Sequence, residues 1–443
     1  MAPSIATVAE PAATPTDRDG GASRALDARL ERAGTLRVAA AIGLVALAIY
    51  LASNPGRSNV YAHYVWQADA WLDGRFAIAW PVRDGPLRND YYHDVVPVGP
   101  EEPGRGLIPF PPLPAVVLLP AVAAFGLAAD AELIAAIIGA LNAALAWLVA
   151  RRIAGRPSVA LVATIFFSFG TVAWVAAARG STWYLAHDVA ITFTLLAIAS
   201  GLSGRGLRAG LLLGVATLAR LTAVFGAPFV LFATPGPAWR RVLLTGAGLA
   251  LPLALLVAYN TASTGQLLHP AYGELYRTEQ PAIPGLHHPD WFMVDPRYVP
   301  QNVAIMLLQP PRLDRQCGVL PVVRTCPDEA RALTLVPDGL GMSLLLTSPG
   351  WLLALPALRR PRSVLVIGCA FAIFAIALVD LMHFSQGWVQ FGYRFSNDWA
   401  PFGLVLVTLS LDRIGLHRAA LLLIALSVLV NLWGVYWAEV FGW

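Results

Sequence analysis

The chain contains a series of long apolar stretches separated by polar segments, and this pattern limits it to few folds. A transmembrane helix needs about 20 consecutive apolar residues. Two apolar stretches are interrupted, 107–127 by prolines and 209–234 by Arg220. We expect an all-α polytopic membrane protein, a bundle of about 10–11 helices with a large first extracytoplasmic loop carrying interfacial helices. The other predicted spans are 37–53, 130–150, 158–178, 183–200, 242–258, 340–358, 363–382, 399–414 and 418–438.

Composition supports the bilayer as the solvent for this chain. Of its 443 residues, 57% are hydrophobic and only 13% are charged, whereas a soluble domain carries about 25% charged residues. So much apolar surface cannot be buried inside one globule. The net charge of +4 comes from arginine, since the sequence has no lysine. No basic soluble module is visible, which argues against a nucleic-acid partner.

The placement of arginine predicts the orientation of the chain. Short cytoplasmic loops of membrane proteins are enriched in basic residues. If 107–127 is interfacial or re-entrant instead of spanning, every short-loop arginine cluster falls on one side. We therefore expect a multi-pass cell-membrane protein with a cytoplasmic N-terminus. The clusters are Arg151/Arg152/Arg156, Arg205/Arg208, Arg240/Arg241, Arg359/Arg360/Arg362 and Arg413/Arg418.

This threading divides the chain into a tail and one membrane domain. Residues 1–36, rich in Ala, Pro, Thr, Asp and Arg, are predicted to be a disordered cytoplasmic tail. Residues 37–443 form the transmembrane domain, with 54–129 as the first extracytoplasmic loop and 259–339 as the second large one. Outside loops of this length usually have a function.

Cysteines and metal ligands give a narrow set of expectations. Cys317 and Cys326 share the second large loop, and they can form a local disulfide if that loop faces an oxidising compartment. No Cys/His cluster indicates zinc. A divalent cation held by carboxylates remains open, so metal dependence is undecided.

The first outside loop holds the candidate catalytic acids. The stretch 61–76 has helical spacing of apolar and aromatic residues, which predicts an interfacial amphipathic helix that carries Asp69. Asp90 and Asp94 follow in NDYYHDVV (89–96). A carboxylate at a membrane surface can deprotonate an acceptor hydroxyl as general base. The alternatives are solvated surface carboxylates at 61–76 and an ordinary turn at 89–96.

Three arginines are predicted to reach one outer-leaflet cavity. Arg220 lies at membrane depth, where a charge is costly unless it faces a cavity or partner. Arg179 and Arg394 lie at the outer ends of apolar spans. The planar guanidinium fork matches phosphate oxygens, so an anionic lipid phosphate is the expected ligand. Arg394 could instead pair with Asp398, four residues on.

Aromatic and histidine side chains surround these arginines in the sequence. His187 follows Arg179, and its simplest role is a hydrogen bond to a neighbouring helix. Tyr393 belongs to HFSQGWVQFGYRFSNDWAPF (383–402), a mixture of aromatic and polar residues that suits either sugar recognition or an interfacial belt.

Five motifs occur in an order that resembles one family. The motifs are HYVWQADAWLDGRF (63–76), FPPLPAVVLLPAVAAFG (110–126), RGSTWYLAH (179–187), GLLLGVATLAR (210–220) and GWVQFGYRFSNDWAPF (387–402). Over about 37–410 the chain resembles membrane glycosyltransferases of the GT-C superfamily, particularly the RgtA/B/C/D-like and protein-mannosyltransferase-like group.

The resemblance implies a reaction and a site. Such enzymes take a sugar from a polyprenyl-phosphate donor, with inversion, and pass it to a glycan, lipid or protein acceptor. Their catalytic acid lies just past the first span, often as an Asp-Glu pair, but SNVYAHY (58–64) has none. Asp94, Asp69 and Asp90 are the remaining acids. The substrate-binding candidates are Arg220, which matches a basic position of relatives, with Arg394, Arg179, His187, Tyr393 and His63.

Two other functions compete with glycosyl transfer. A transporter or lipid flippase predicts paired broken helices in two related halves, but the sequence shows only one such hairpin. A non-catalytic membrane assembly factor would explain the missing Asp-Glu pair. That reading fails if Asp69 or Asp94 lines a cavity together with Arg220.

Overall fold

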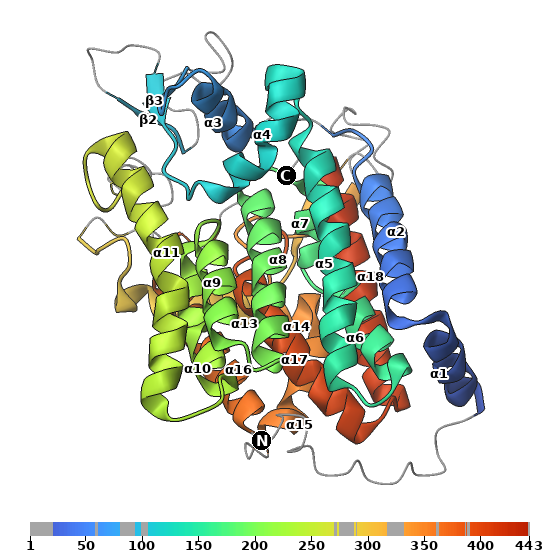
Figure 1. The fold of residues 1–443 in the computed structure, drawn as a ribbon. Helices are drawn as coiled ribbons and strands as arrows, with labels where there is room; N and C mark the ends of the chain where they lie inside the picture. The colour runs from blue at the N-terminus through green and yellow to red at the C-terminus, as the bar shows by residue number, and fades with distance from the viewer. Residues whose placement is uncertain are drawn as a thin grey trace.

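In the computed structural model the helices form a bundle (Figure 1). Two small β-sheets accompany it. The cysteine pair Cys317 and Cys326 and the candidate acid Asp90 lie outside the described residues. The described residues are 21–57, 61–79, 94–98, 105–269, 273, 288, 290–316, 332–359, 363–385, 387 and 390–441.

Within these described ranges six helices are long and apolar enough to cross a membrane. A bent pair, α6 (Pro157–Phe169) and α7 (Ala173–Arg179), makes a seventh span if it counts as one. A further helix, α17 (Ser396–Ile414), carries three charged residues and is enclosed by other helices. The prediction of an all-α polytopic membrane fold is confirmed. The six are α2 (Thr35–Ser53), α5 (Ala131–Ile153), α8 (Thr182–Leu202), α11 (Ala238–Thr264), α16 (Val364–Met382) and α18 (Arg418–Phe441).

The remaining predicted spans correspond to broken helices. The stretch 158–178 bends by 56° between α6 and α7. The stretch 209–234 breaks at 218–220, where the sequence predicts a turn near Arg220. Hydropathy averages over a window, so it counts apolar residues without registering these breaks. The stretch 209–234 falls within α9 (Gly206–Thr217), η4 (Leu221–Gly226) and α10 (Ala227–Ala233). The predicted span 340–358 consists of three short helices, α14 (Leu344–Thr347), η8 (Pro349–Ala354) and α15 (Leu355–Leu358).

Glycines allow α9 and α11 to pack with their backbones in contact. A Cβ built on Gly248 would lie 2.4 Å from the Leu207 carbonyl oxygen and 2.6 Å from the Leu211 nitrogen. A Cβ on Gly210 would lie 2.6 Å from the Thr245 carbonyl oxygen. Small residues let membrane helices approach this closely, and this contact holds the broken helix beside α11.

We expect Gly248→Ala to destabilise the protein by about 1–3 kcal/mol, the usual cost of overpacking. The clashing atoms are backbone and cannot rotate away. Gly246→Ala is the matched control, because nothing lies within 4 Å of its Cβ position in the same helix and alanine is the better helix former. Thermal unfolding in detergent measures both variants. Equal unfolding temperatures for the two would contradict the close contact.

The arginine-rich connections gather at one end of the bundle. Arg152 at the end of α5 donates to the Ala199 carbonyl near the end of α8, at 2.6 Å. The Gly155 N–H donates to Asp412 at the end of α17, at 3.0 Å. Together these contacts place the ends of three helices side by side, as the predicted topology requires.

Part of the predicted disordered tail is a helix at this same end. Residues 21–33 form α1 (Gly21–Ala33), which Figure 1 shows at the foot of the bundle. Asp27 accepts a 2.6 Å hydrogen bond from the Ser158 N–H, capping the start of α6. Helix-forming Ala, Leu, Arg and Glu residues fill α1. Composition alone could not show the contact with α6 that holds this helix in place.

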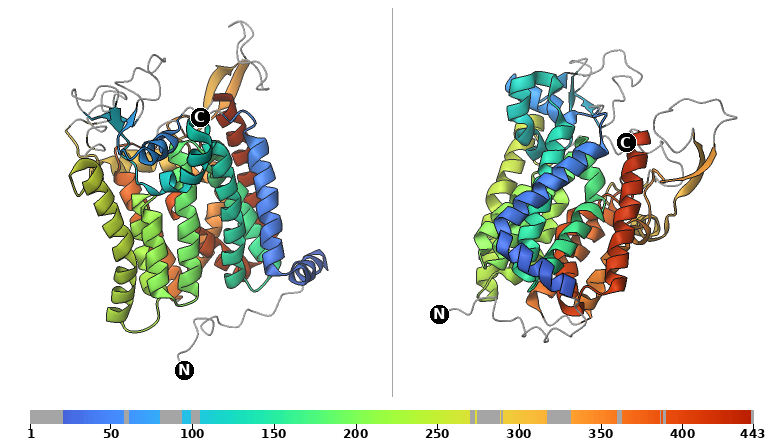
Figure 2. Two further views of the ribbon diagram at one scale, coloured as in Figure 1. Left: turned by 45° about the horizontal axis from the view of Figure 1, so that its top comes forward. Right: turned by 90° about the vertical axis from the view of Figure 1, so that its right-hand side faces the viewer.

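The opposite end carries the polar structure outside the bundle. Helix α3 (His63–Leu72) lies there, as the sequence predicts for an interfacial helix, beside the short α4 (Leu113–Phe125) that replaces a full span at 107–127. Figure 2 shows both sheets at this end. They are the antiparallel sheet β1–β3–β2 of β1 (Ile78–Ala79), β3 (Arg105–Leu107) and β2 (Val96–Pro97), and the hairpin of β4 (Arg312–Gln316) and β5 (Ala332–Val336).

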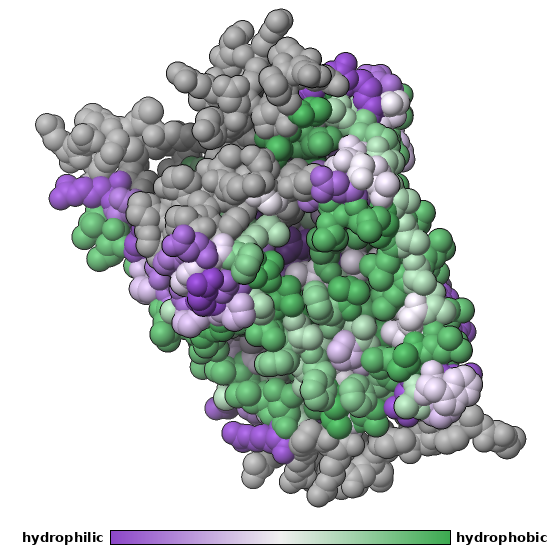
Figure 3. Space-filling model, turned by 90° about the vertical axis from the view of Figure 1, so that its left-hand side faces the viewer, coloured by the Kyte–Doolittle hydropathy of each residue, from purple (hydrophilic) through white to green (hydrophobic). Residues whose placement is uncertain are grey.

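The outside of the bundle is hydrophobic between its two polar ends. Figure 3 shows one such face, hydrophobic across its middle. Large apolar side chains on α11 and α16 are exposed, which suits contact with lipid. They include Val242, Leu251, Leu255, Phe371 and Phe374.

Candidate functional site

A cavity of about 380 Å³ lies at the end of the bundle that carries α3 and α4. This volume falls in the range of small-molecule sites, roughly 300–1,000 Å³. Its polar lining comes from segments far apart in sequence, which the broken helix and the start of α17 bring together. The polar lining residues are Asp94, Arg220, Thr222, Asn260, His269, Asp380, His383, Ser385 and Arg394.

Arg220 is fixed by a buried carboxylate. It follows the end of α9 in an extended conformation, which turns its side chain into the bundle. Its Nη2 lies 2.8 Å from Oδ2 of Asp398, and its Nε lies 3.1 Å from Oδ1. His187 Nδ1 (2.7 Å) and Thr222 Oγ1 (2.5 Å) contact the same carboxylate. The Asp398 side chain is 1% exposed and that of Arg220 is 18% exposed, so Arg220 lines the cavity while Asp398 is buried.

Arg394 lies among aromatic rings. Its guanidinium carbon is 5.6 Å from the ring centroids of Trp183 and Phe395, and 5.8 Å from that of Tyr184. These distances fit cation–π contacts. The backbone N–H of Arg394 donates to the Gln390 side chain at 2.7 Å. The arginine is therefore held rigidly, with a charge that faces the cavity.

Asp94 lies on the other side of the same indole. Its Oδ2 accepts a 2.6 Å hydrogen bond from Trp183 Nε1. Its backbone has φ of 59°, an unusual conformation for a residue with a side chain. Strained residues of this kind cluster at functional sites. Burial, and then the nearby Asp94 charge, raise the pKa of Tyr61.

Apolar residues form the side of the cavity toward the lipid-facing helices. Leu221 of η4, Leu256 of α11 and Val379 of α16 line it. Leu221 is 48% exposed, and Leu268 at the rim is 82% exposed. Burial lowers the pKa of His269, another rim residue, to about 4, so this imidazole is neutral at physiological pH. The cavity thus joins a charged inner wall to an apolar outer one.

The other predicted site residues that the structure describes lie outside the lining of this cavity. Asp69 is half-buried on α3 and contributes no lining atoms. His63 is buried, with its Nδ1 2.8 Å from Thr182 Oγ1. His187 and Tyr393 are buried behind the cavity wall. Burial, and then the charges of Asp380 and Asp398, raise the pKa of Tyr393.

Arg179 belongs to a separate polar cluster. Its Nη1 contacts Oε2 of Glu439 on α18 at 2.6 Å and donates to Asn54 at 3.1 Å. Asn54 in turn donates to Glu132 at 2.8 Å. The cluster ties α2, α5, α7 and α18 together, so Arg179 has a structural role in this arrangement.

We expect Arg179→Ala to lower stability by about 3–5 kcal/mol, the usual cost of removing one partner of a buried ion pair. The loss arises because Glu439 and Glu132 keep their buried charges without the guanidinium. Chemical unfolding of the purified protein measures the change. The Glu439 side chain is 19% exposed, so Glu439→Gln should lower stability by less than Arg179→Ala does. A fully stable Arg179→Ala variant would contradict the proposed role.

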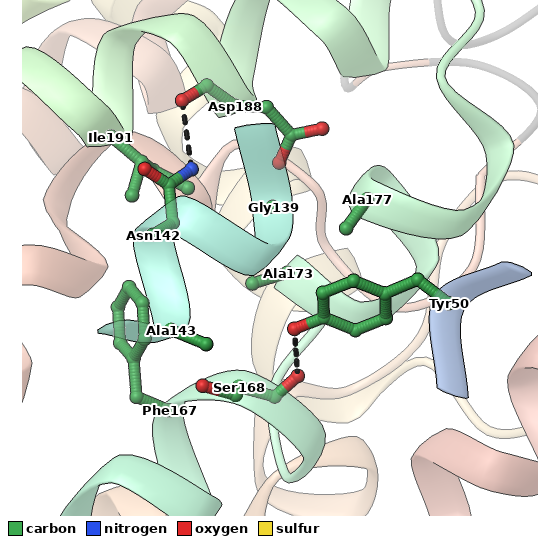
Figure 4. A pocket seen from close by; sticks show the side chains of 10 residues that line it. All are labelled: Tyr50, Gly139, Asn142, Ala143, Phe167, Ser168, Ala173, Ala177, Asp188 and Ile191. Atoms are coloured by element: carbon green, nitrogen blue, oxygen red, sulfur yellow. Dashed lines mark hydrogen bonds between the residues drawn. The ribbon is translucent and has the colours of Figure 1, made fainter. Parts of the chain in front are cut away.

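A second, much smaller cavity lies between α2, α5, α6, α7 and α8 (Figure 4). Its volume is about 10 Å³, room for about one water molecule. Tyr50 donates to the Ser168 carbonyl at 3.1 Å, and Asn142 donates to the Asp188 carbonyl at 2.9 Å. A sugar or lipid phosphate does not fit there.

Sequence reasoning missed several residues that build the larger cavity. Asp380 ends an apolar span, Trp183 lies unremarked within RGSTWYLAH, and the sequence suggests Asp398 only as a partner of Arg394. In the structure Asp398 binds Arg220 instead. The signal available was a carboxylate inside or next to an apolar span, which is rare unless it is functional.

Within the described part of the chain no group of three or more His, Cys, Asp or Glu residues could hold a metal ion.

Comparison with known proteins gives one distant structural likeness. No model of a known protein family matches the sequence, and no curated protein matches it either. The structure is similar to a crystal structure of ArnT from Cupriavidus metallidurans bound to undecaprenyl phosphate, with a TM-score of 0.43 and 17% sequence identity. The match covers 86% of this chain and 61% of that one. A likeness this distant assigns neither an activity nor a ligand to this chain.

Proposed function

We propose that the protein is an integral-membrane glycosyltransferase. It moves a sugar from a polyprenyl-phosphate donor to an acceptor hydroxyl on the extracytoplasmic side, with inversion. The arginine-rich end of the bundle would face the cytoplasm, and the cavity would face outward. This is the function that the sequence resemblance implies, and the geometry of the cavity supports it independently.

One observation carries the proposal. Asp94 and Arg394 contact the edge and the face of the same Trp183 ring, and Arg220 lines the same cavity. A candidate general base and a candidate phosphate-binding cation thus contact the same ring and line the same cavity. A non-catalytic assembly factor needs no base beside a cationic group. The presence of Asp94 and Arg220 in the lining of one cavity therefore favours the enzyme.

The residues would divide the reaction as follows. The Asp94 carboxylate accepts the proton of the acceptor hydroxyl. The acceptor oxygen forms a bond to the anomeric carbon, and the bond from that carbon to the phosphate oxygen breaks. The electron pair leaves with the polyprenyl phosphate, whose charge Arg394 stabilises. Arg220, neutralised by Asp398, would shape the wall and donate hydrogen bonds.

The apolar wall supports a lipid-linked donor over a soluble one. A polyprenyl chain could leave the cavity past Leu221 and Leu256 toward the lipid-facing surface of α11. The phosphate would then stay at the arginines while the chain stays in the bilayer. A soluble nucleotide sugar would leave this apolar surface unused.

Reconstituted protein in liposomes tests the proposal. We expect sugar-dependent release of free polyprenyl phosphate when a polyprenyl-phosphate sugar is the donor and a hydroxyl acceptor is present. Movement of the intact donor across the bilayer without release would instead support the flippase. Neither release nor movement, over a panel of hexose and pentose donors, would leave the assembly factor as the better reading.

A further inference from the structure

Asp380 is a buried carboxyl group that lines the cavity, and its side chain has no hydrogen-bond partner among the described residues. It lies in the last turn of α16 and is 4% exposed. Its Oδ2 is fully buried and accepts no hydrogen bond from any residue that the structure describes. An unsatisfied buried polar atom costs free energy unless a ligand or water satisfies it. The site therefore has an acceptor awaiting a donor.

The charges around the cavity are unevenly distributed. Arg220 is already bound by Asp398, so Asp380 adds a second carboxylate at that side. Arg394 lies among aromatic rings, beside Trp183. A phosphate is favoured near Arg394 and disfavoured near Asp380. The cavity thus has a positive region for the phosphate and an acceptor-rich region for a different part of the donor.

We propose that Asp380 binds hydroxyl groups of the transferred sugar and thereby contributes to sugar selectivity. This inference rests on the proposed function. A carboxylate offers four lone pairs and can accept hydrogen bonds from two neighbouring hydroxyls. Asn260 and His383 line the same cavity and offer further polar contacts. Sites that pair a buried polar group with a substrate hydroxyl discriminate strongly against analogues that lack it.

The test compares binding of two lipids that differ only in the sugar. The probes are undecaprenyl phosphate and undecaprenyl phosphate carrying the best sugar of the donor panel. The proteins are the wild type, Asp380→Asn and Asp380→Ser in nanodiscs, with Asp73→Asn as the control because Asp73 is exposed on the surface. Thermal unfolding verifies that each variant is folded, and if one is not, the other carries the test.

We expect both Asp380 variants to weaken binding of the sugar-bearing lipid about tenfold or more, the contribution of a hydrogen bond to a charged group. Binding of bare undecaprenyl phosphate should be unchanged, because this lipid carries no sugar hydroxyl. Equal weakening for both lipids, or no change for either, would overturn the proposal. If the wild type binds neither lipid, the proposed function itself is wrong, and this inference falls with it.

Discussion

Replacing Asp94 with asparagine is expected to lower the rate of sugar transfer by about 10²–10⁴-fold, the usual contribution of a general base. Asparagine keeps the shape and can still accept the hydrogen bond from Trp183 Nε1. It cannot take the proton of the acceptor hydroxyl. The loss should therefore appear in kcat, with binding of polyprenyl phosphate unchanged. Initial rates in proteoliposomes measure it.

Asp69→Asn is the matched control, because Asp69 lies on the same side of the protein and outside the cavity lining. It should keep transfer within a few-fold of the wild type. Trp183→Phe removes the indole donor that orients Asp94 and should have an intermediate effect. If Asp69→Asn loses transfer and Asp94→Asn does not, the catalytic base has been assigned to the wrong acid.

Asp398→Ala is expected to destabilise the protein by about 3–5 kcal/mol. The carboxylate receives hydrogen bonds from Arg220 and Thr222 and contacts His187. Its removal leaves the Arg220 charge partly buried without its counter-ion. Because these partners join α8, η4 and α17, the loss should appear as a lower unfolding temperature of the whole bundle. Chemical unfolding in detergent measures the change.

Two comparisons separate this ion pair from general damage to α17. Asp412→Ala changes a carboxylate at the other end of the same helix, where it binds only the Gly155 N–H among described residues, and should cost about 1 kcal/mol. The double variant Arg220→Met with Asp398→Leu should recover much of the stability, since apolar replacements of a buried ion pair are often neutral. A double variant no more stable than Asp398→Ala would contradict this.

The membrane fold could be predicted because its signals are local. Apolar length predicts the long helices, and the placement of the arginine clusters predicts that 107–127 does not span. The charge of Arg220 marked the break in 209–234. Arginine placement grouped the short connections at one end, and the contacts of Arg152 and Asp412 place those connections together.

The site could be predicted only in part, because it depends on contacts between distant segments. Arg220 and Asp398 are 178 residues apart, and Arg179 and Glu439 are 260 apart. All three candidate arginines look alike in sequence, at outer or buried ends of apolar runs. Only the packing of α18 shows that Arg179 is bound by Glu439, outside the cavity. Asp380 stands out locally as a carboxylate at the end of an apolar run, but only the packing of distant segments shows that it lines the cavity.

Binding of undecaprenyl phosphate to the wild type and to Arg394→Gln tests the central claim most directly. The matched control is Arg179→Gln, and Arg394→Lys keeps the charge without the planar fork. We expect Arg394→Gln to weaken binding by about tenfold or more, as for loss of a charge-assisted hydrogen bond. The affinity of Arg394→Lys should fall between that of the wild type and that of Arg394→Gln. Arg179→Gln should bind like the wild type. Unchanged binding by a folded Arg394→Gln variant would contradict a lipid-phosphate site in this cavity.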